Sequence, residues 1–316
     1  MLDTLILADG AIKDNAFTRI LRRTPQRCPP DARGLGRQQH PLRIEPVQDI
    51  FESPAFLADP VLDGNLKTMA VRKGDHYVVN GQKVWISTAQ VAHKIMLLAR
   101  TTPIEEVTSP THGLSLFYTD FDRTKIEVRE IEKLGRKAVD SNQLFIDSLE
   151  IPIDDRIGEE GRGFEYILHG LNPERVLLAA EATGIGRAAL RRAAKYAGER
   201  IVFDRPIGKN QGIQHPLAER WIDLEAGTLL YQRAAWLYDQ KKSCGAEANA
   251  AKYFCAEAGY RAAETAVLTH GGFGYAKEYH VERYLREAML PRIAPVSPQL
   301  ILCFIAEKVL GLPKSY

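Results

Sequence analysis

A glutamate and an arginine stand together at the start of an apolar helical run, and this pair could carry out acid–base chemistry. Glu174 and Arg175 follow Asn172-Pro173 and come directly before an apolar stretch that begins at Val176. A carboxylate becomes a useful base when it is positioned and shielded from water, since desolvation raises its pKa towards neutrality. The alternative is structural, because a glutamate in the first turn of a helix also complements the helix dipole.

Residues 161–199 form the helical stretch that must position this pair. Asn172 can cap a helix and Pro173 suits a first turn, so we expect the helix to restart or kink there and to place Glu174 at the bend. Gly184 and Gly186 lie further along the same stretch. Small residues at these positions would let a flat ring or a neighbouring backbone approach closely.

The remaining C-terminal sequence predicts more helices. Apolar residues recur at steps of four and three over 213–238, as expected for helix-on-helix packing. An alanine-rich helix is expected over about 246–269, stopping at Gly271-Gly272, which would form its C-cap. Shorter helices near 278–288 and 298–310 complete the predicted bundle.

The sequence before residue 163 has the alternation of a β domain. Six or seven short strands separated by turn residues are expected from about Thr68 to Pro152, with a hairpin at Gly74-Asp75 and separate strands HYVVNG and QKVWIS that meet at Gly81. A turn-rich stretch up to Gly163 closes this part. The fold class is therefore α+β, a sandwich or barrel-like β domain followed by an up-down helical bundle. The expected divisions are 1–58, 59–158 and 159–316.

Composition and cysteine usage exclude several classes of protein. The chain has 316 residues, a net charge of +2 and four cysteines, none in a C-x-x-C pair. Neither a disulfide scaffold nor a metal site is expected, and a reducing compartment is the default. We expect no secretory signal and no membrane span, hence a cytoplasmic protein, or a mitochondrial matrix or peroxisomal one in a eukaryote. Residues 1–58, rich in Arg and Pro, are expected to pack poorly.

Five blocks in order resemble the acyl-CoA dehydrogenase family. They are YVVNGQKVWIS, LGRKAVDSNQLFIDSLEIP, GEEGRGF, ERIVFDRPIGKNQGIQ and HGGFGY. The resemblance covers roughly residues 66–316, corresponding to the family's middle β domain and its C-terminal helical domain. It implies α,β-desaturation of an acyl-CoA thioester, with FAD accepting the hydride. It also implies a homodimer or homotetramer and an electron-transfer flavoprotein as electron acceptor, with no nucleic acid.

The resemblance also implies which residues hold the cofactor. Trp85, Ile86 and Ser87 match the segment that lies against the flavin ring. The positions that match contacts with the pyrophosphate, the adenosine portion or the cofactor of a partner subunit are Arg200, Phe203, Asn210, Gln211, Gly271, Gly272, Ser297 and Gln299. Each also has a structural interpretation, such as a strand core, a helix-end cation, turn chemistry, a helix stop or an N-cap.

The chain departs from the family at the usual base. Pro295 occupies that position in the run from Ile293 to Gln299, and proline has neither a carboxylate nor a backbone N–H. A subset of the family resembling isovaleryl- and long-chain-type enzymes places its glutamate where Glu174 lies. The base is then either Glu174 or absent, and Glu181 is the nearest rival. Asn172 and Arg175 are the substrate-side candidates, with Arg175 serving the CoA moiety or holding Glu174.

Two further departures concern the acyl pocket. The first flavin loop, Asp59 to Thr68, is shortened, and the family's N-terminal helical domain is not recognisable in residues 1–58. Leu268 stands where the family often has Gln. The competing interpretation is a non-catalytic subunit or truncated paralogue that acts through its bundle interface. A nucleic-acid-binding relative has less support, because the arginine-rich start lacks interleaved aromatic residues.

Overall fold

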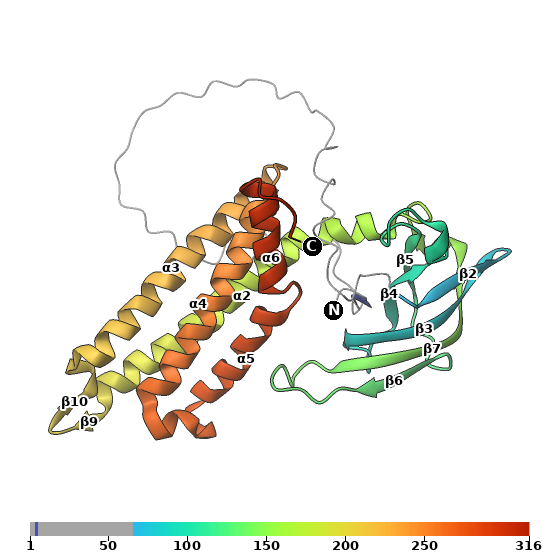
Figure 1. Cartoon of the computed structure of the whole chain (residues 1–316). Helices are drawn as coiled ribbons and strands as arrows, with labels where there is room; N and C mark the ends of the chain where they lie inside the picture. The colour runs from blue at the N-terminus through green and yellow to red at the C-terminus, as the bar shows by residue number, and fades with distance from the viewer. Residues whose placement is uncertain (1–3, 6–65, 316) are drawn as a thin grey trace, which may run out of the picture.

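The computed structural model describes residues 4–5 and 66–315, and these form a β-sheet domain followed by a helical bundle (Figure 1). The expected division into a β part and a helical part is confirmed. Apart from Thr4–Leu5, the predictions for residues 1–58 and for the flavin loop before Leu66 lie outside the described residues. Thr4–Leu5, the strand β1, pairs with β4.

One curved sheet forms the first domain, in the order β6-β7-β3-β2-β4-β5-β8. Its strands are β2 (Met69–Lys73), β3 (His76–Ser87), β4 (Lys94–Arg100), β5 (Leu114–Asp120), β6 (Ile126–Glu130), β7 (Ser141–Pro152) and β8 (Arg156–Ile157). Neighbours pair antiparallel except β2 and β4, which meet in parallel. A core of alternate apolar residues, including Tyr77, Ile95 and Phe117, fills the concave side.

The predicted hairpin is present, but two predicted strands are one. Gly74 has φ +65° between β2 and β3, where Lys73 pairs with His76. The expected break at Gly81 does not occur, because β3 runs through it with a bulge against β7. A Cβ at Gly81 would lie 2.6 Å from the Cα of Thr68, so this glycine allows a close backbone approach and does not make a turn.

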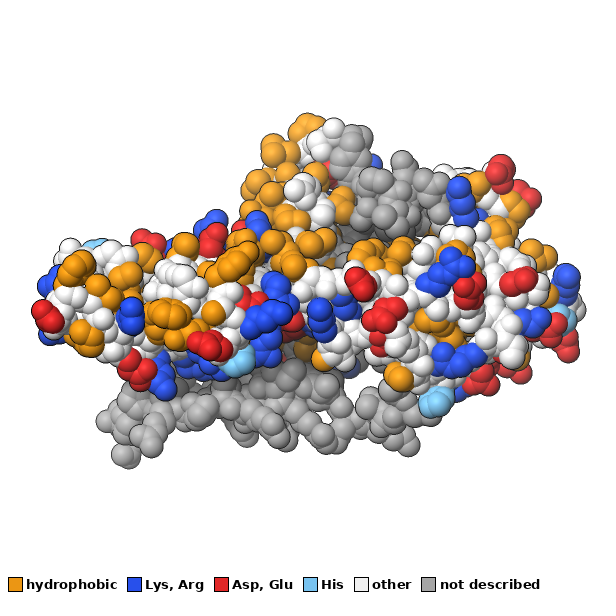
Figure 2. All heavy atoms as spheres, turned by 90° about the horizontal axis from the view of Figure 1, so that it is seen from below, with side chains coloured by type: hydrophobic (Ala, Val, Ile, Leu, Met, Phe, Trp, Pro, Cys, Tyr) orange, Lys and Arg blue, Asp and Glu red, His pale blue; other side chains and the backbone are white. Residues whose placement is uncertain are grey.

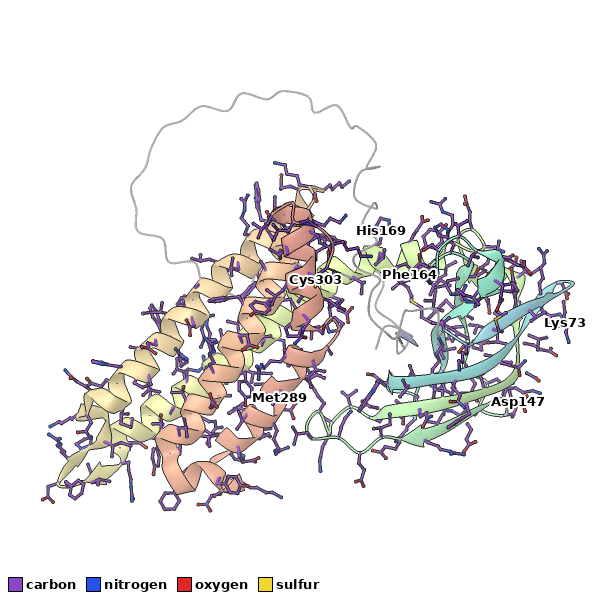
Figure 3. The ribbon with its side chains drawn as sticks, in the orientation of Figure 1. Lys73, Asp147, Phe164, His169, Met289 and Cys303 are labelled. Carbon is purple, nitrogen blue, oxygen red and sulfur yellow. The ribbon has the colours of Figure 1, made fainter. Side chains whose placement is uncertain are left out.

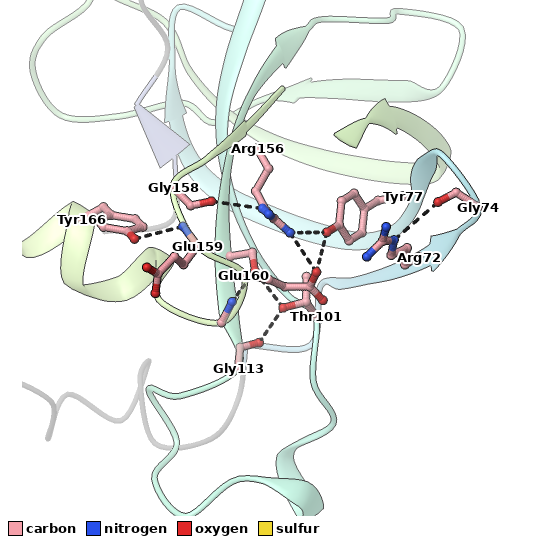
Figure 4. A network of polar contacts seen from close by, with 12 residues as sticks. Arg72, Gly74, Tyr77, Thr101, Gly113, Arg156, Gly158, Glu159, Glu160 and Tyr166 are labelled. Atoms are coloured by element: carbon pink, nitrogen blue, oxygen red, sulfur yellow. Dashed lines mark hydrogen bonds and ion pairs between the residues drawn. The ribbon is translucent and has the colours of Figure 1, made fainter. Parts of the chain in front are cut away.

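A polar network closes the sheet where the chain turns towards the helices (Figure 4). The Tyr77 hydroxyl donates to Glu160 at 2.7 Å, and Arg156 donates to both at 2.8 Å. The Glu159 N–H donates to the Tyr166 hydroxyl at 3.0 Å, at the first turns of the next helix. The network thereby fixes the direction in which that helix leaves the sheet.

The helical domain, as far as the structure describes it, contains two short strands and seven named helical segments, besides the single turns. Its elements are α2 (Gly163–Glu199), β9 (Ile201–Val202), β10 (Arg205–Pro206), α3 (Gln211–Asp239), α4 (Gly245–His270), η5 (Gly271–Tyr275), α5 (Val281–Ile293), α6 (Pro298–Phe304) and its continuation η7 (Ile305–Val309). The remaining single turns in the described chain are η2 (Ile104–Glu106), η3 (Ile153–Asp155), η4 (Ile207–Lys209) and η6 (Lys277–Tyr279). The start of α2 at Gly163 and the end of α4 before Gly271 match expectation, whereas α5 begins and ends later than predicted.

Of the two alternatives expected at Pro173, a restart or a kink, the restart is wrong, because α2 is a single helix of 37 residues with Pro173 inside it. Proline removes one backbone hydrogen bond. The rest of α2 packs along α3 and α4, and this packing keeps the helix continuous. Asn172 is consequently no N-cap, and its Oδ1 accepts a hydrogen bond from Arg175 Nη1 at 3.0 Å.

Some glycines of α2 and α4 allow close contact between the two helix backbones rather than contact with a bound ring. A Cβ at Gly259 would lie 2.4 Å from the Ala182 carbonyl oxygen, and one at Gly186 would lie 2.9 Å from the Cα of Gly259. Helices α2 and α4 therefore touch backbone to backbone along alanine-rich faces. Gly184, by contrast, faces open space.

No single helix in the described chain has both the length and the hydropathy that a membrane span requires. One bent pair, Val281–Ile293 with Pro298–Val309, has both only when its two members are taken together.

Candidate active site

Helix α2 carries Glu174 from the sheet into the bundle. In Figure 3, Phe164 and His169 mark the first turns of α2 beside the sheet, whereas Met289 lies on α5 in the bundle. Phe164 is buried in an apolar cluster with Leu98 and other sheet residues. Glu174 follows in the part of the helix that bridges the two domains.

The face of α2 that bears Glu174 is tied to the sheet domain through Glu181. Glu181, two helical turns later and hence on the same face, is bonded to Arg136 in the loop between β6 and β7. That loop leads into Ser141 and Asn142, which pair with Ser87 and Ile86 at the end of β3. The rival base Glu181 is therefore engaged in an ion pair, and the loop that it contacts leads to the partner strand of the predicted flavin segment.

Glu174 lies in surroundings that favour its neutral form. Burial raises the pKa of its carboxyl group, and the charge of Arg175 opposes that shift. Burial has the larger of the two effects, so the pKa of Glu174 is raised. The sequence alone left the direction of this shift undecided. A carboxylate of this kind is a better base than a solvated one.

Arg175 is buried with 1% of its surface exposed, and desolvation lowers its pKa. Its Nη1 donates a hydrogen bond to the Asn172 Oδ1. Both predicted roles of Arg175, serving the CoA moiety and holding Glu174, stay predictions.

Trp85 is an exposed and strained aromatic residue at the end of β3. Its φ is +62° and its indole is 43% exposed, while the neighbouring Ile86 is buried in the sheet core. Asn142 donates from Nδ2 to the Ile86 carbonyl at 3.0 Å and fixes the strand end. The structural interpretation, a core residue, holds for Ile86 and fails for Trp85. Strained conformations of this kind cluster at functional sites.

The segment 294–297 replaces the family's usual base loop. Pro295 and Val296 are buried, and the Ser297 hydroxyl caps α6 by accepting from Leu300 N–H at 3.3 Å, as its structural interpretation predicts. Gln299 is exposed on the first turn of α6. The segment is tied to the bundle core by Lys252, which donates from Nζ to the Val296 carbonyl at 2.6 Å.

A second part of the predicted site lies at the far end of the bundle. A pocket of about 450 Å³ is lined by Tyr196, Arg200, Val202, Ile207, Leu268, Thr269, His270, Gly271, Gly272 and Phe273. Arg200 lies over the Phe273 ring at 5.5 Å. His270 stacks on Tyr196 with ring centroids 4.2 Å apart, and its Nδ1 bonds the Ala266 carbonyl at 2.7 Å. Seen from below, this end shows hydrophobic side chains among Lys and Arg (Figure 2).

Phe203, Asn210 and Gln211, also predicted for this part, follow Arg200 in sequence but do not line the pocket. Phe203 is 93% exposed at the tip of the β9–β10 hairpin, where its φ is +52°. Asn210 accepts from Arg205 at 2.7 Å and precedes the exposed Gln211 at the start of α3. A Cβ added at Gly271 or at Gly272 would meet nothing within 4 Å. The two glycines therefore leave open space in which a ligand can approach the backbone.

The two parts of the predicted cofactor site are far apart in one chain. Glu174 and Arg200 are 26 positions apart along α2, a distance of roughly 39 Å at the rise of an α-helix. Figure 1 likewise places the end of β3 and the β9–β10 hairpin in different regions of the molecule. One chain brings together Arg200 with Gly271-Gly272, and both lie far from Glu174.

Sequence reasoning missed Arg136, Lys252, Tyr196 and His270. Their signals were a charged residue in a turn, a lysine within an alanine-rich helix, a tyrosine near the end of a helix and a histidine beside a glycine pair, none of them specific alone. Within the described part of the chain, no group of three or more His, Cys, Asp or Glu could hold a metal ion.

Family models match both described domains. The acyl-CoA dehydrogenase middle domain matches residues 63–149, and the acyl-CoA dehydrogenase C-terminal domain matches residues 161–309. The chain belongs to the acyl-CoA dehydrogenase family. The expectation drawn from the five sequence blocks is thereby confirmed.

Individual relatives support the same assignment. The chain is 40% identical over 253 residues to the acyl-CoA dehydrogenase fadE12 of Mycobacterium bovis, covering 79% of this chain and 64% of that protein. It is 36% identical to the cyclohex-1-ene-1-carbonyl-CoA dehydrogenase of Syntrophus aciditrophicus, over 72% of this chain and 55% of the relative. The structure of a glutaryl-coenzyme A dehydrogenase complex superposes with a TM-score of 0.75 at 32% identity, covering 80% and 63% of the two chains. The chain thus spans about 64% of the length of fadE12.

Proposed function

We propose that this protein desaturates an acyl-CoA thioester at its α,β bond, with FAD as cofactor. The observation that supports the proposal is that Glu174 shares a face of α2 with Glu181, which Arg136 ties to the loop leading to the strand end that carries the exposed Trp85. We infer that the base on α2 faces the aromatic side chain at the end of β3. This is the arrangement that proton abstraction beside a bound ring requires.

The role of Glu174 follows from the acidity of the substrate. The α-proton of a thioester is only weakly acidic, so its removal needs a positioned and desolvated carboxylate. The raised pKa of Glu174 fits that requirement. Pro295 supplies no base, and Glu181 is held by Arg136. Glu174 is therefore our choice for the group that takes the α-proton.

The residues present fit an FAD molecule shared between subunits. FAD supplies the hydride acceptor when bound. Trp85 and Ser87 would lie against its ring, and Arg200 with the open backbone at Gly271-Gly272 would hold its phosphates. Since these two groups are far apart in one chain, a second copy must contribute one of them.

An exposed stripe on α3 supports self-association. Ile222, Leu229 and Trp236 recur every seven residues and are 60%, 70% and 49% exposed. Residues 211–226 contain three acidic residues and one basic residue, and residues 227–242 three basic residues and one acidic residue. Two antiparallel copies of α3 would match these charges and bury the stripe, as an isologous interface does. We propose a homodimer or homotetramer with this symmetry.

The substrate class is an acyl-CoA. Two of the relatives named above are a cyclohex-1-ene-1-carbonyl-CoA dehydrogenase and a glutaryl-CoA dehydrogenase, and both names contain a CoA thioester. We infer the same class for this chain and, from the family resemblance, an electron-transfer flavoprotein as acceptor. The alternative function, a non-catalytic subunit, is favoured by one observation, the proline at the usual base position.

A spectroscopic experiment tests the proposal. The purified protein, reconstituted with FAD, is mixed without oxygen with a panel of straight, branched and cyclic acyl-CoA thioesters. Loss of the yellow flavin absorbance with any member supports desaturation. Tight FAD binding with no bleaching by any thioester supports the non-catalytic subunit, and failure to bind FAD contradicts the proposed desaturation.

A further inference from the structure

The loop between β6 and β7 is fastened to two helices of the bundle. The backbone N–H of Arg136 donates to both carboxylate oxygens of Glu287 on α5, at 2.9 and 3.1 Å. Its guanidinium pairs with Glu181 on α2 and lies 3.7 Å from Glu287. Arg286 donates to the Leu134 carbonyl at 3.0 Å. We call this set of contacts, centred on Arg136, the latch.

The latch joins residues that are far apart in sequence. Arg136 is 45 positions from Glu181 and 151 from Glu287. The side chains of the three residues are 30%, 37% and 24% exposed, so the ion pairs are only partly screened by water. A Cβ at Gly135 would lie 3.2 Å from the Arg286 carbonyl oxygen, which shows how closely the loop lies against α5.

Both ends of the latch lead directly to groups of the proposed site. Glu181 shares its helix face with Glu174 two turns earlier. The loop continues into Ser141 and Asn142, the partners of Ser87 and Ile86 at the end of β3. A change in the latch would therefore alter the distance between the Glu174 face and the strand end that carries Trp85.

We propose that Arg136 is a positioning residue that sets the gap between the Glu174 face of α2 and the end of β3. This inference rests on the proposed function, because the gap is where the substrate and the flavin ring would lie. Arg136 touches neither of them and acts through Glu181 and Glu287. The expected effect of losing it is on the rate of proton abstraction, since small misplacements of reacting groups cost about a hundredfold in rate.

The test compares Arg136→Leu with Arg129→Leu, a matched control. Arg129 also pairs with a glutamate, Glu127, but this exposed pair lies within β6. We expect Arg136→Leu to slow flavin reduction at saturating acyl-CoA by about tenfold to a hundredfold, with the FAD dissociation constant near that of the wild type. The charge-swapped variant Arg136→Glu with Glu181→Arg should recover part of the rate, which separates positioning from a loss of folding.

A second readout does not depend on activity. Spin labels are attached through unnatural amino acids at positions 125 and 195, exposed on the sheet domain and on α2, in protein diluted with unlabelled subunits. We expect a narrow distance distribution in the wild type and in Arg129→Leu, and a broader or shifted one in Arg136→Leu with Glu287→Ala. Equal distributions would overturn the proposal, as would reduction by Arg136→Leu at the wild-type rate. If the wild type is never reduced but the distribution changes, the gap-setting role stands and the proposed function alone fails.

Discussion

At the residue scale, the account depends on a carboxylate whose surroundings disfavour its charge. Burial raises the pKa of Glu174, and Arg175 compensates only in part. Burial also disfavours the charged form of Lys252 and therefore lowers the pKa of its ammonium group. Helices α2 and α4 thus each contain an ionisable group whose charged form is disfavoured by burial.

The raised pKa of Glu174 predicts a pH dependence. The base is the ionised form, so the rate of flavin reduction at limiting acyl-CoA should fall on acidification through a pKa above the usual glutamate range. For stability the sign is opposite, because the neutral form is favoured in the folded state and stability is lost as pH rises through the folded pKa. Stopped-flow traces over the acidic range measure the first effect. An acid limb at the ordinary glutamate pKa would contradict this prediction.

Lys252 predicts a second pH effect, on stability alone. Burial lowers its pKa from 10.5 to about 8, so the folded state binds fewer protons than the unfolded chain between these values. The free energy of unfolding should therefore rise with pH over that interval, by up to about 3 kcal/mol at 1.36 kcal/mol per pKa unit. Urea unfolding of the wild type and Lys252→Met measures it. Identical pH slopes in both proteins would exclude this role for Lys252.

At the element scale, the two glycines after α4 have different roles: Gly271 is structural, and Gly272 faces the proposed ligand. Gly271 has φ +60° and ends the helix, so Gly271→Ala should destabilise the fold by about 1 kcal/mol. Gly272 has no positive φ and faces open space, so Gly272→Val should leave the melting temperature nearly unchanged and weaken FAD binding. Flavin fluorescence and thermal unfolding measure the two effects. Unchanged FAD affinity in Gly272→Val would remove this backbone from the cofactor site.

The elements also show what the sequence can and cannot predict. The change of period at Gly163 and the end of α4 at Gly271 were predictable because each depends on local patterns or a single glycine. The continuity of α2 through Pro173 was not, because packing against α3 and α4 outweighs the local cost of proline. The latch at Arg136 was not predictable either, since its partners come from two distant helices.

At the scale of the whole molecule, the split site makes self-association part of the function. Leu229→Glu would place a charge in the exposed stripe of α3 and should weaken association by about tenfold or more, equivalent to at least 1.4 kcal/mol. Val91→Glu is the matched control, because Val91 is 68% exposed on the sheet domain. Sedimentation velocity with and without FAD measures the effect. A wild-type protein that stays monomeric at every concentration would refute the shared site.

The central claim is that Glu174 removes the substrate proton, and anaerobic stopped-flow reduction of the FAD-bound protein tests it most directly. With a thioester that bleaches the wild type, Glu174→Gln should reduce the flavin about a hundredfold to ten-thousandfold more slowly, which is the usual contribution of a general base. Its acyl-CoA dissociation constant should change little. Equal reduction rates in Glu174→Gln and the wild type would contradict the account.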